Sequence, residues 1–388
     1  MRKWRVPRAP KTPPAPAALN PAQLAGFRRK LLAWFHRAKR DLPWRRTRDP
    51  YRIWISEIML QQTRVAAVIP YYGRFLKRFP NVRALARARL ETVLRHWAGL
   101  GYYSRARNLH RAAKAIVTRH GGRFPRELDE ALALAGIGRY TAAAVLSIAY
   151  GKPLAVLDGN GARVLARLGA VRGDLRAPRH WRQFEKASAA LLAPRAAGDW
   201  NQAMMELGAK VCTPMAPHCA ECPVAAFCRA RSLGIENEVP TARRKRVPVQ
   251  ITVAAAVLLD ANGRTLLVRP DAHTSVAEVE SLFSRLWQFP AVIAGKNARA
   301  ELAAHLRKQC GMDGDGNKFQ MTPMDPARHT VTFREIQLAP FLVRLARLPS
   351  PPAGNSKTIP LSCVSKLAVS SATRKIAASA ISQTDNVP

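Results

Sequence analysis

The chain has 388 residues, which predicts two or three domains, and its 48% hydrophobic and 23% charged residues are the balance of a folded protein. Lys and Arg number 63 against 25 Asp and Glu, and the formal net charge of +38 favours a polyanionic partner, nucleic acid first. A solvated basic surface or an Arg-rich host composition is the alternative. No apolar run approaches the roughly 18 residues of a membrane span, which excludes the transmembrane class.

The N-terminal residues 1–22 are rich in Pro and basic side chains and lack the apolar segment of a signal peptide. We expect a disordered basic arm there. Four of the six cysteines crowd together, unlike the cysteines of a secreted disulfide framework. We therefore expect a reducing compartment, namely the cytoplasm of a bacterium, with the protein associated with the nucleoid.

From residue 23 to about 230, apolar residues recur with helical spacing, and no alternating strand pattern interrupts them. We predict an all-α unit at 23–230 and a basic linker at 231–248. The expected helices are Leu24–Ala38, Ile53–Ile69, Leu85–Ala98, Ala106–His120, Leu128–Ala135, Thr141–Tyr150, Ala162–Leu168 and Trp181–Leu192.

A second unit of the α+β class is predicted at 249–348. Asn262 and Gly263, between two β-branched apolar runs, are typical of a tight hairpin turn. Residues 349–388 are rich in Ser, Ala, Thr and Pro and poor in aromatic residues, which predicts a disordered tail. The expected strands are Gln250–Leu259, Arg264–Arg269, His329–Arg334 and Phe341–Leu345, with a helix at Arg299–Gln309.

Four cysteines follow the spacing Cys212-x6-Cys219-x2-Cys222-x5-Cys228. Four thiolates suit either zinc or an iron–sulfur cluster. Zinc modules usually carry two matched C-x2-C pairs, whereas this segment has one short pair and two unequal arms. The 6-2-5 spacing resembles the [4Fe–4S] loop of the helix-hairpin-helix DNA glycosylases, which implies one cluster per chain in a structural or DNA-positioning role, with zinc as the alternative.

A glycine-containing turn, Gly136-Ile-Gly138-Arg139, lies between two predicted helices. The glycines permit a tight turn that exposes successive N–H groups where the next helix begins, a geometry that binds a phosphate. A G-x-G pair alone more often only turns the chain. Flanked by helices in a strongly basic chain, it predicts a helix-hairpin-helix clamp on a nucleic-acid phosphate.

Two carboxylates are candidates for chemistry. Asp158, in the segment Asp158-Gly-Asn160-Gly, precedes a predicted helix and by itself indicates an N-cap; near a phosphate-binding hairpin it could also face a sugar that loses its base. Glu57 shares a predicted helix face with Ile53 and Trp54. Apolar neighbours raise the pKa of a carboxyl group and keep it protonated, as a general acid requires. A half-exposed Glu without a catalytic role is the alternative.

These motifs, in this order, resemble adenine DNA glycosylases of the MutY type, in the helix-hairpin-helix base-excision repair superfamily. The resemblance is strong over about Leu31–Arg229 and weak over the second unit. Tyr140 stands where endonuclease III-type glycosylase/lyases carry a Schiff-base lysine, so the resemblance implies a monofunctional glycosylase. It rests on Pro43-Trp44-Arg45, the Glu57 segment, Gly99-Leu-Gly-Tyr-Tyr-Ser-Arg105, the hairpin, Asp158-Gly-Asn160, Trp200-Asn-Gln202 and the four cysteines.

The resemblance implies a monomeric enzyme without a nucleotide cofactor. The enzyme flips adenine opposite 8-oxoguanine or guanine out of double-stranded DNA and cuts its N-glycosidic bond. Glu57 would protonate adenine N7, Asp158 would stabilise the oxocarbenium-like sugar, and Tyr140 and Asn160 would hold these groups and the water. The remaining implied contacts are Trp44, Arg45, Leu60 and Gln202 in the adenine pocket, and Gln62, Thr63, Tyr102, Gly136, Gly138 and Arg139 on the DNA.

The second unit resembles the degenerate Nudix-like domain that reads 8-oxoguanine. The glutamate-rich box that holds magnesium in Nudix hydrolases is reduced to Glu301, so pyrophosphate hydrolysis is not expected. Many members carry Phe-Ser-His on a strand of this domain, where this chain has Val331, Thr332 and Phe333. We expect a preference for 8-oxoguanine carried mainly by Thr332, and narrower than in those members because Val331 stacks less well than Phe.

Two other functions remain open from the sequence. A bifunctional glycosylase/lyase is disfavoured by Tyr140 and by the second unit. A non-enzymatic iron–sulfur DNA-binding protein would keep the charge, the hairpin and the cysteines but would not need Glu57 and Asp158.

Overall fold

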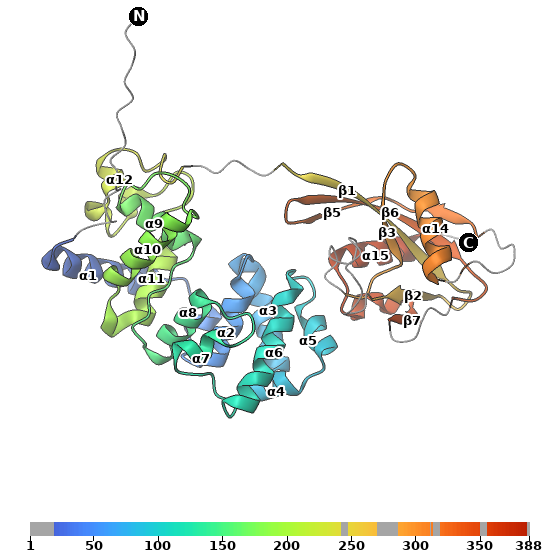
Figure 1. Cartoon of the computed structure of the whole chain (residues 1–388), viewed down its shortest axis with the longest axis horizontal. Helices are drawn as coiled ribbons and strands as arrows, with labels where there is room; N and C mark the ends of the chain where they lie inside the picture. Colours follow the sequence, from blue (N-terminus) through green and yellow to red (C-terminus); the bar gives the residue numbers. More distant parts are fainter. Residues whose placement is uncertain are drawn as a thin grey trace, which may run out of the picture. The chain divides into compact units, whose positions relative to one another are not determined.

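The computed structural model describes residues 19–241, 247–269, 286–310, 312, 319–349 and 355–385. Most of the predicted N-terminal arm and part of the predicted linker lie outside the described residues. The chain, whose elements are labelled in Figure 1, divides into two compact units, and the division does not fall where the helices end. The first unit comprises Met1–Tyr72, Asn81–Arg83 and Ala112–Arg244, and the second comprises Gly73–Pro80, Ala84–Arg111 and Lys245–Pro388.

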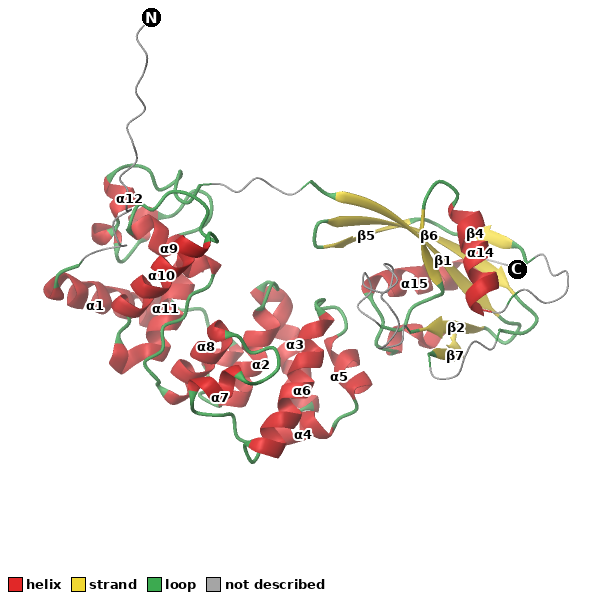
Figure 2. Cartoon of the chain, viewed as in Figure 1, coloured by secondary structure: helices red, strands yellow, loops and turns green. Residues whose placement is uncertain are grey.

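The N-terminal two thirds of the chain are helical, as predicted (Figure 2). The helices are α1 (Pro21–Ala38), α2 (Pro50–Leu60), α3 (Val65–Arg78), α4 (Val82–Arg87), α5 (Leu90–Trp97), α6 (Tyr103–Arg119), α7 (Leu128–Leu132), α8 (Arg139–Tyr150), α9 (Gly159–Leu168), α10 (Pro178–Leu191), α11 (Ala197–Lys210) and α12 (Arg229–Ser232), with short 3-10 turns that include η1 (Pro43–Arg45).

The structure corrects two helix predictions and contains one helix that was not predicted. The helix expected at Ile53–Ile69 is two helices, because α2 ends at Leu60 and Gln62 takes the left-handed backbone conformation (φ 56°), which a right-handed helix cannot contain. The helix expected at Leu85–Ala98 is likewise divided into α4 and α5. Helix α11 was not predicted, although it carries several residues of the site.

Close packing of α11 against α8 fixes the centre of the first unit. A Cβ added at Gly198 of α11 would lie 2.8 Å from the Ser147 carbonyl oxygen of α8, so only glycine permits this approach. Asn201 of α11 donates to the Ser147 hydroxyl at 2.9 Å and to the Leu154 carbonyl at 2.8 Å. These contacts hold the N-terminal half of α11 against the last turn of α8.

The C-terminal part of the second unit is a mixed sheet with a helix on each face. The strand order is β4-β6-β1-β2-β7, β1 and β6 are parallel, and the other pairs are antiparallel. Successive residues of β1 enter opposite cores, one shared with α14 and one with α15, so its buried residues form a continuous apolar run. The elements are β1 (Val249–Leu259), β2 (Arg264–Val268), β3 (Ala291–Ala294), α14 (Ala298–Cys310), β4 (Met321–Pro323), β5 (Ala327–Val331), β6 (Arg334–Arg344), β7 (Ser356–Pro360) and α15 (Ser371–Asp385).

The expected β1–β2 hairpin is present, with Leu259 opposite Thr265. The disordered tail predicted over 349–388 is wrong for the residues described there, since they form β7 and α15. Ala372, Ile376 and Ala380 of α15 are buried against the sheet. Small apolar residues let this helix lie close to the strands, and composition alone does not distinguish them from a Ser/Ala-rich disordered segment.

Within the described residues, no helix is both long and apolar enough to cross a membrane.

Candidate active site

The first turn of α2 explains how Glu57 comes to be buried. Asp49 caps the helix by accepting from the Tyr51 amide at 2.9 Å, and Pro50 occupies the first helical position. The helix then enters the core, and every residue from Tyr51 to Met59 except Arg52 is buried. Glu57 is 6% exposed, and its Oε2 is buried without a hydrogen-bond partner among the described residues.

Burial, and to a smaller extent the charge of Asp158, raise the pKa of Glu57 from an ordinary 4.5 to about 7. A hydrogen bond with Tyr140 and the positive charge of Arg45 act in the opposite direction. The expected protonation of Glu57 near neutral pH is therefore supported by its surroundings. A carboxyl group in this state can donate a proton to a bound base.

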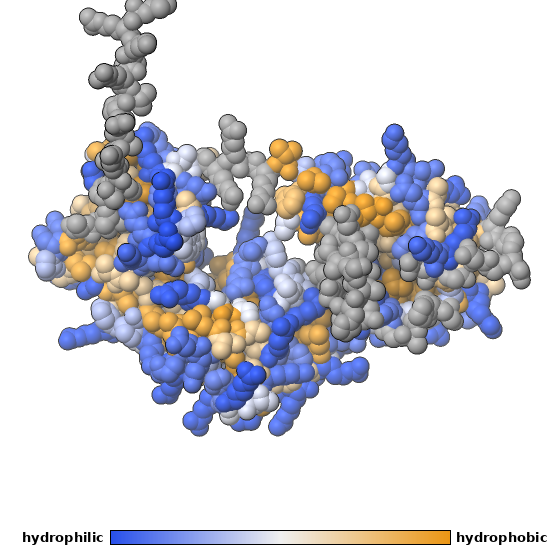
Figure 3. Space-filling model, in the orientation of Figure 1, coloured by the Kyte–Doolittle hydropathy of each residue, from blue (hydrophilic) through white to orange (hydrophobic). Residues whose placement is uncertain are grey.

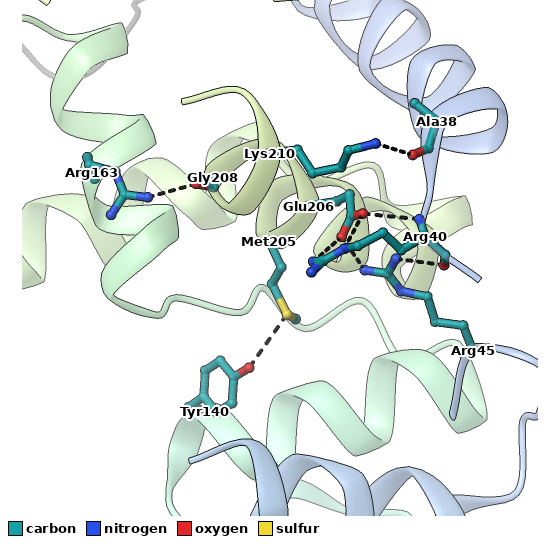
Figure 4. Close-up of polar contacts among 9 residues, drawn as sticks. All are labelled: Ala38, Arg40, Arg45, Tyr140, Arg163, Met205, Glu206, Gly208 and Lys210. Carbon is teal, nitrogen blue, oxygen red and sulfur yellow. Dashed lines mark hydrogen bonds and ion pairs between the residues drawn. The ribbon is translucent and has the colours of Figure 1, made fainter. Parts of the chain in front are cut away.

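Tyr140 lies in the first turn of α8, and its hydroxyl donates to the Met205 sulfur of α11 at 3.5 Å (Figure 4). Burial, and then the charges of Glu57 and Asp158, raise the pKa of Tyr140 well above its ordinary value. The phenol thus keeps its proton and can only donate or accept hydrogen bonds. No amine is available at this position for a Schiff base.

Asp158 is the N-cap of α9, and its Oδ1 accepts from the Gly161 amide at 2.6 Å. The cap reading is confirmed, and it does not exclude a catalytic role, because the charge of Asp158 acts on both Glu57 and Tyr140. The amide oxygen of Asn160 accepts from Arg163 at 3.1 Å. The structure therefore groups Glu57, Tyr140 and Asp158 from three different helices.

The hairpin between α7 and α8 has the geometry of a phosphate site. Gly136 takes a left-handed conformation (φ 75°), and exposed Gly138 is the N-cap of α8. A Cβ added at Gly138 would meet nothing within 4 Å, so the space around this N-cap, next to the first amides of α8, is open. Arg139 is exposed beside them. A phosphate can approach these N–H groups and the positive end of the helix dipole.

The four residues assigned to an adenine pocket have different surroundings. Trp44 is buried and packs edge-on against Tyr72, with ring centroids 5.4 Å apart. Arg45 is bound to Glu206 at 2.8 Å, so its guanidinium is already paired. Leu60, at the end of α2, and Gln202, on α11, are half-buried. Of these four residues, only Arg45 affects the pKa of Glu57, and it does so through its positive charge.

Two predicted DNA-contacting residues share an unusual backbone conformation. Gln62 (φ 56°) and Tyr102 (φ 47°) are left-handed and exposed, Tyr102 at 40%. Residues other than glycine rarely adopt this region, and those that do are concentrated at functional sites. Thr63 is half-buried and its hydroxyl donates to the Gln61 carbonyl at 3.3 Å, so it is directed toward the chain.

Three residues of the site were missed by sequence reasoning: Arg40, Met205 and Glu206. Glu206 is fully buried, and its carboxylate accepts from Arg40 and Arg45. Glu206 follows Met204 and Met205 and precedes Leu207, and an acidic residue among apolar neighbours is the same signal that pointed to Glu57. It would have indicated Glu206 had α11 been predicted.

The four cysteines are half-buried and form no disulfide with one another, and buried Arg167 of α9 contacts one of them, Cys212. Arg167 donates to the Cys212 sulfur at 3.2 Å and to the Thr213 carbonyl at 2.6 Å. Burial raises the pKa of Cys222 to about 11, and the neighbouring thiols contribute. Among the described residues, however, no three His, Cys, Asp or Glu side chains are grouped so that they could hold a metal ion.

The structure corrects the placement of the predicted 8-oxoguanine reader. Strand β5 ends at Val331, and Thr332 and Phe333 form the turn to β6 rather than part of a strand. Thr332 is exposed and left-handed (φ 57°), and its hydroxyl donates to the Val331 carbonyl at 2.7 Å. The strand predicted at His329–Arg334 is therefore interrupted by a two-residue turn at Thr332 and Phe333.

A cavity of about 780 Å³ in the first unit is separate from this site. It lies at the start of α2 and is lined by Tyr51, Trp54, Phe124, Arg126 and Tyr150 among others, and Glu57 is not among its lining residues.

Comparison with known proteins identifies the helical domain. Residues 55–189 match the HhH-GPD superfamily base excision DNA repair protein family. The solved structure of a thermostable thymine-DNA glycosylase superposes with a TM-score of 0.50 at 29% identity and covers 54% of this chain and 97% of that chain. Residues 55–189, in the helical part of the chain, are thus similar to base-excision repair proteins of this superfamily.

Within that superfamily, the resemblance to adenine DNA glycosylases of the MutY type is confirmed. The human adenine DNA glycosylase is 47% identical over 219 residues, which are 54% of this chain and 40% of the human protein. The Arabidopsis thaliana adenine DNA glycosylase is 39% identical over 312 residues, 70% of this chain and 48% of that protein. The chain therefore matches less than half the length of either relative.

Proposed function

We propose that the protein is a monofunctional DNA glycosylase that excises adenine opposite 8-oxoguanine or guanine. The observation that carries the proposal is the buried carboxyl group of Glu57, with a pKa of about 7, beside Tyr140 and Asp158. Two carboxyl groups in unlike surroundings are the usual equipment for cutting a glycosidic bond, one as the acid and one to stabilise the cationic sugar.

The reaction follows from these surroundings. Glu57 gives its proton to N7 of the flipped adenine, so that the C1′–N9 bond breaks and its electron pair leaves with the base. The Asp158 carboxylate faces the positive charge that develops on the sugar. Water then adds to C1′ and returns a proton to Glu57, which completes the cycle. The DNA strand is left intact, because Tyr140 offers no amine that could form an imine with the sugar.

One assay separates the three candidate functions. The full chain is incubated with a duplex that holds one adenine opposite 8-oxoguanine, and half of each sample is then treated with hot alkali. We expect strand cleavage only after alkali. Cleavage without alkali would indicate a lyase, and no cleavage would indicate a binding protein.

DNA binding is proposed to depend on the α7–α8 hairpin and on the basic surface. The amides at the start of α8 would hold one phosphate, and the excess of Lys and Arg would hold others through charge. Hydrophilic residues cover much of the helical part on the face shown in Figure 3.

We propose that Cys212, Cys219, Cys222 and Cys228 hold a [4Fe–4S] cluster. Four soft thiol donors suit iron, and the pKa of Cys222 already reflects the other three thiols. The cluster would cross-link the loop that Arg167 joins to α9, the helix whose N-cap is Asp158.

The purified full chain should be brown and contain about four iron atoms, and changing Cys222→Ser should remove most of the colour and lower the melting temperature. Metal analysis and visible absorption are the measurements. Cys363→Ser, at a cysteine outside the loop, is the matched control and should leave both unchanged. A colourless protein with one zinc per chain would contradict the assignment.

We further propose that the second unit's sheet domain is Nudix-like and reads 8-oxoguanine through the β5–β6 turn. Thr332→Ala should reduce the preference for 8-oxoguanine over guanine several-fold, because the hydroxyl is exposed at the turn. Single-turnover excision on both duplexes measures it. Thr332→Gly also removes the hydroxyl but favours the left-handed conformation. If only Thr332→Ala lost the preference for 8-oxoguanine, the conformation of the turn would matter rather than the hydroxyl. If neither variant lost it, 8-oxoguanine would be recognised by other residues.

A further inference from the structure

Glu206 is a fully buried acid that the proposed chemistry does not use. It lies on α11, directly after Met205, whose sulfur accepts from the Tyr140 hydroxyl (Figure 4). Its Oε1 accepts from the Arg40 amide at 3.1 Å and from Arg40 Nε at 2.8 Å. Its Oε2 accepts from Arg40 at 2.7 Å and from Arg45 at 2.8 Å. One carboxylate thus binds two guanidinium groups.

The arrangement fixes the position of Arg45. Besides its bond to Glu206, Arg45 donates to the Arg40 carbonyl at 3.2 Å, and its guanidinium carbon lies 5.5 Å from the centre of the Phe35 ring. The Arg45 side chain is only 11% exposed. The positive charge of a buried guanidinium is balanced by its ion-pair partner, here Glu206, because little water is available to screen that charge.

Arg45 is also the cation that acts on Glu57. The titratable groups that shift the pKa of Glu57 are Tyr140 of α8, Asp158 at the N-cap of α9, and Arg45 of η1. Arg45 alone among them favours the ionised, catalytically inactive form of Glu57 through its charge. Helix α11 contributes the uncharged Met205 to Tyr140 and the charged Glu206 to Arg45.

We propose that Glu206 is a positioning residue that holds Arg45 and neutralises its charge, so that Glu57 keeps its proton at neutral pH. This inference rests on the proposed function. The net charge of the cluster formed by Arg40, Arg45 and Glu206 is +1. Without the carboxylate of Glu206, the two arginines would carry a charge of +2. A purely structural role, in which Glu206 only anchors the segment between α1 and η1, predicts no effect on the proton of Glu57.

The experiment follows the protonation of Glu57 in the full chain in two ways. The infrared band of the protonated Glu57 carboxyl group is identified by its loss in Glu57→Gln. Its intensity, measured against pH, gives the pKa of Glu57 and requires no enzymatic activity. Single-turnover excision from the adenine:8-oxoguanine duplex, measured against pH, gives the midpoint of the high-pH decline. The variants are Glu206→Gln, Glu206→Asp and Arg45→Gln. Lys210→Gln is the control, since Lys210 anchors the same segment through the Ala38 carbonyl at 3.1 Å.

We expect Glu206→Gln to lower both midpoints by on the order of one pH unit and Arg45→Gln to raise them. Glu206→Asp, which retains the charge, and Lys210→Gln should keep the wild-type midpoints. A folded Glu206→Gln with unchanged midpoints, or a shift in the same direction for both charge-removing variants, would overturn the proposal. If Glu206→Gln does not fold, unchanged midpoints in Arg45→Gln would overturn the proposal. Absence of excision by the wild type at every pH would instead refute the proposed function, and the infrared titration would still test Glu206.

Discussion

Changing Glu57→Gln should lower the rate of adenine excision by about 100- to 10,000-fold, the range that general acid catalysis contributes. The amide fills the same space but cannot give a proton to N7. Single-turnover excision, with the enzyme in excess over the duplex, measures the chemical step, and a binding titration should show DNA affinity close to that of the wild type.

Glu127→Gln is the matched control for this variant. It makes the same chemical change at a side chain that is 69% exposed and bound to Lys152 on the surface. Its excision rate should equal that of the wild type. A Glu57→Gln rate within tenfold of the wild type, a difference of only ~1.4 kcal/mol in the barrier, would remove Glu57 from the role of acid.

The raised pKa of Glu57 also predicts how stability depends on pH. The carboxyl ionises near 4.5 when the chain is unfolded and near 7 when it is folded. The stability that protonated Glu57 provides is fully present below pH 4.5 and is lost as the pH rises through about 7. Glu57→Gln should therefore raise the melting temperature relative to the wild type more at pH 8 than at pH 4.

Asp158→Asn should lower the excision rate by about 100- to 1,000-fold while leaving the melting temperature nearly unchanged. Asparagine caps a helix as well as aspartate does, so the amide oxygen can still accept from the Gly161 amide. What the variant loses is the negative charge that faces the developing cation. Single-turnover excision and thermal unfolding together separate the two contributions.

Asp49→Asn makes the same substitution at another helix N-cap, that of α2. It should keep both the excision rate and the melting temperature. If Asp158→Asn lost stability instead of rate, the residue would act as a cap alone, and the developing cation would have to be stabilised by another group.

Several features could be predicted from the sequence because they depend on neighbours along the chain. The burial of Glu57 followed from the apolar residues around it on one helix. The turn at Gly136 and Gly138 followed from the freedom of glycine, and the β1–β2 hairpin from Asn262 and Gly263. In each case, the residues that decide the conformation are within a few positions of one another.

Other features depended on residues that are distant in the sequence. The bond between Arg45 and Glu206 spans 161 positions, and that between Tyr140 and Met205 spans 65. Hydrophobic periodicity describes which face of an element is buried, but not which partner it meets. The predicted adenine-pocket role of Arg45 therefore took no account of its pairing with Glu206.

The sequence by itself determined the helical class of the N-terminal part, the carboxylates and the cysteine spacing, because residue type and local spacing specify these directly. Only the tertiary structure decided that α15 packs on the sheet, that Thr332 lies in a turn, and that Asp158 both caps α9 and acts on Glu57 through its charge. The physical reason is that burial and electrostatic interaction depend on distance in space. Folding brings together groups whose separation along the chain carries no information about that distance.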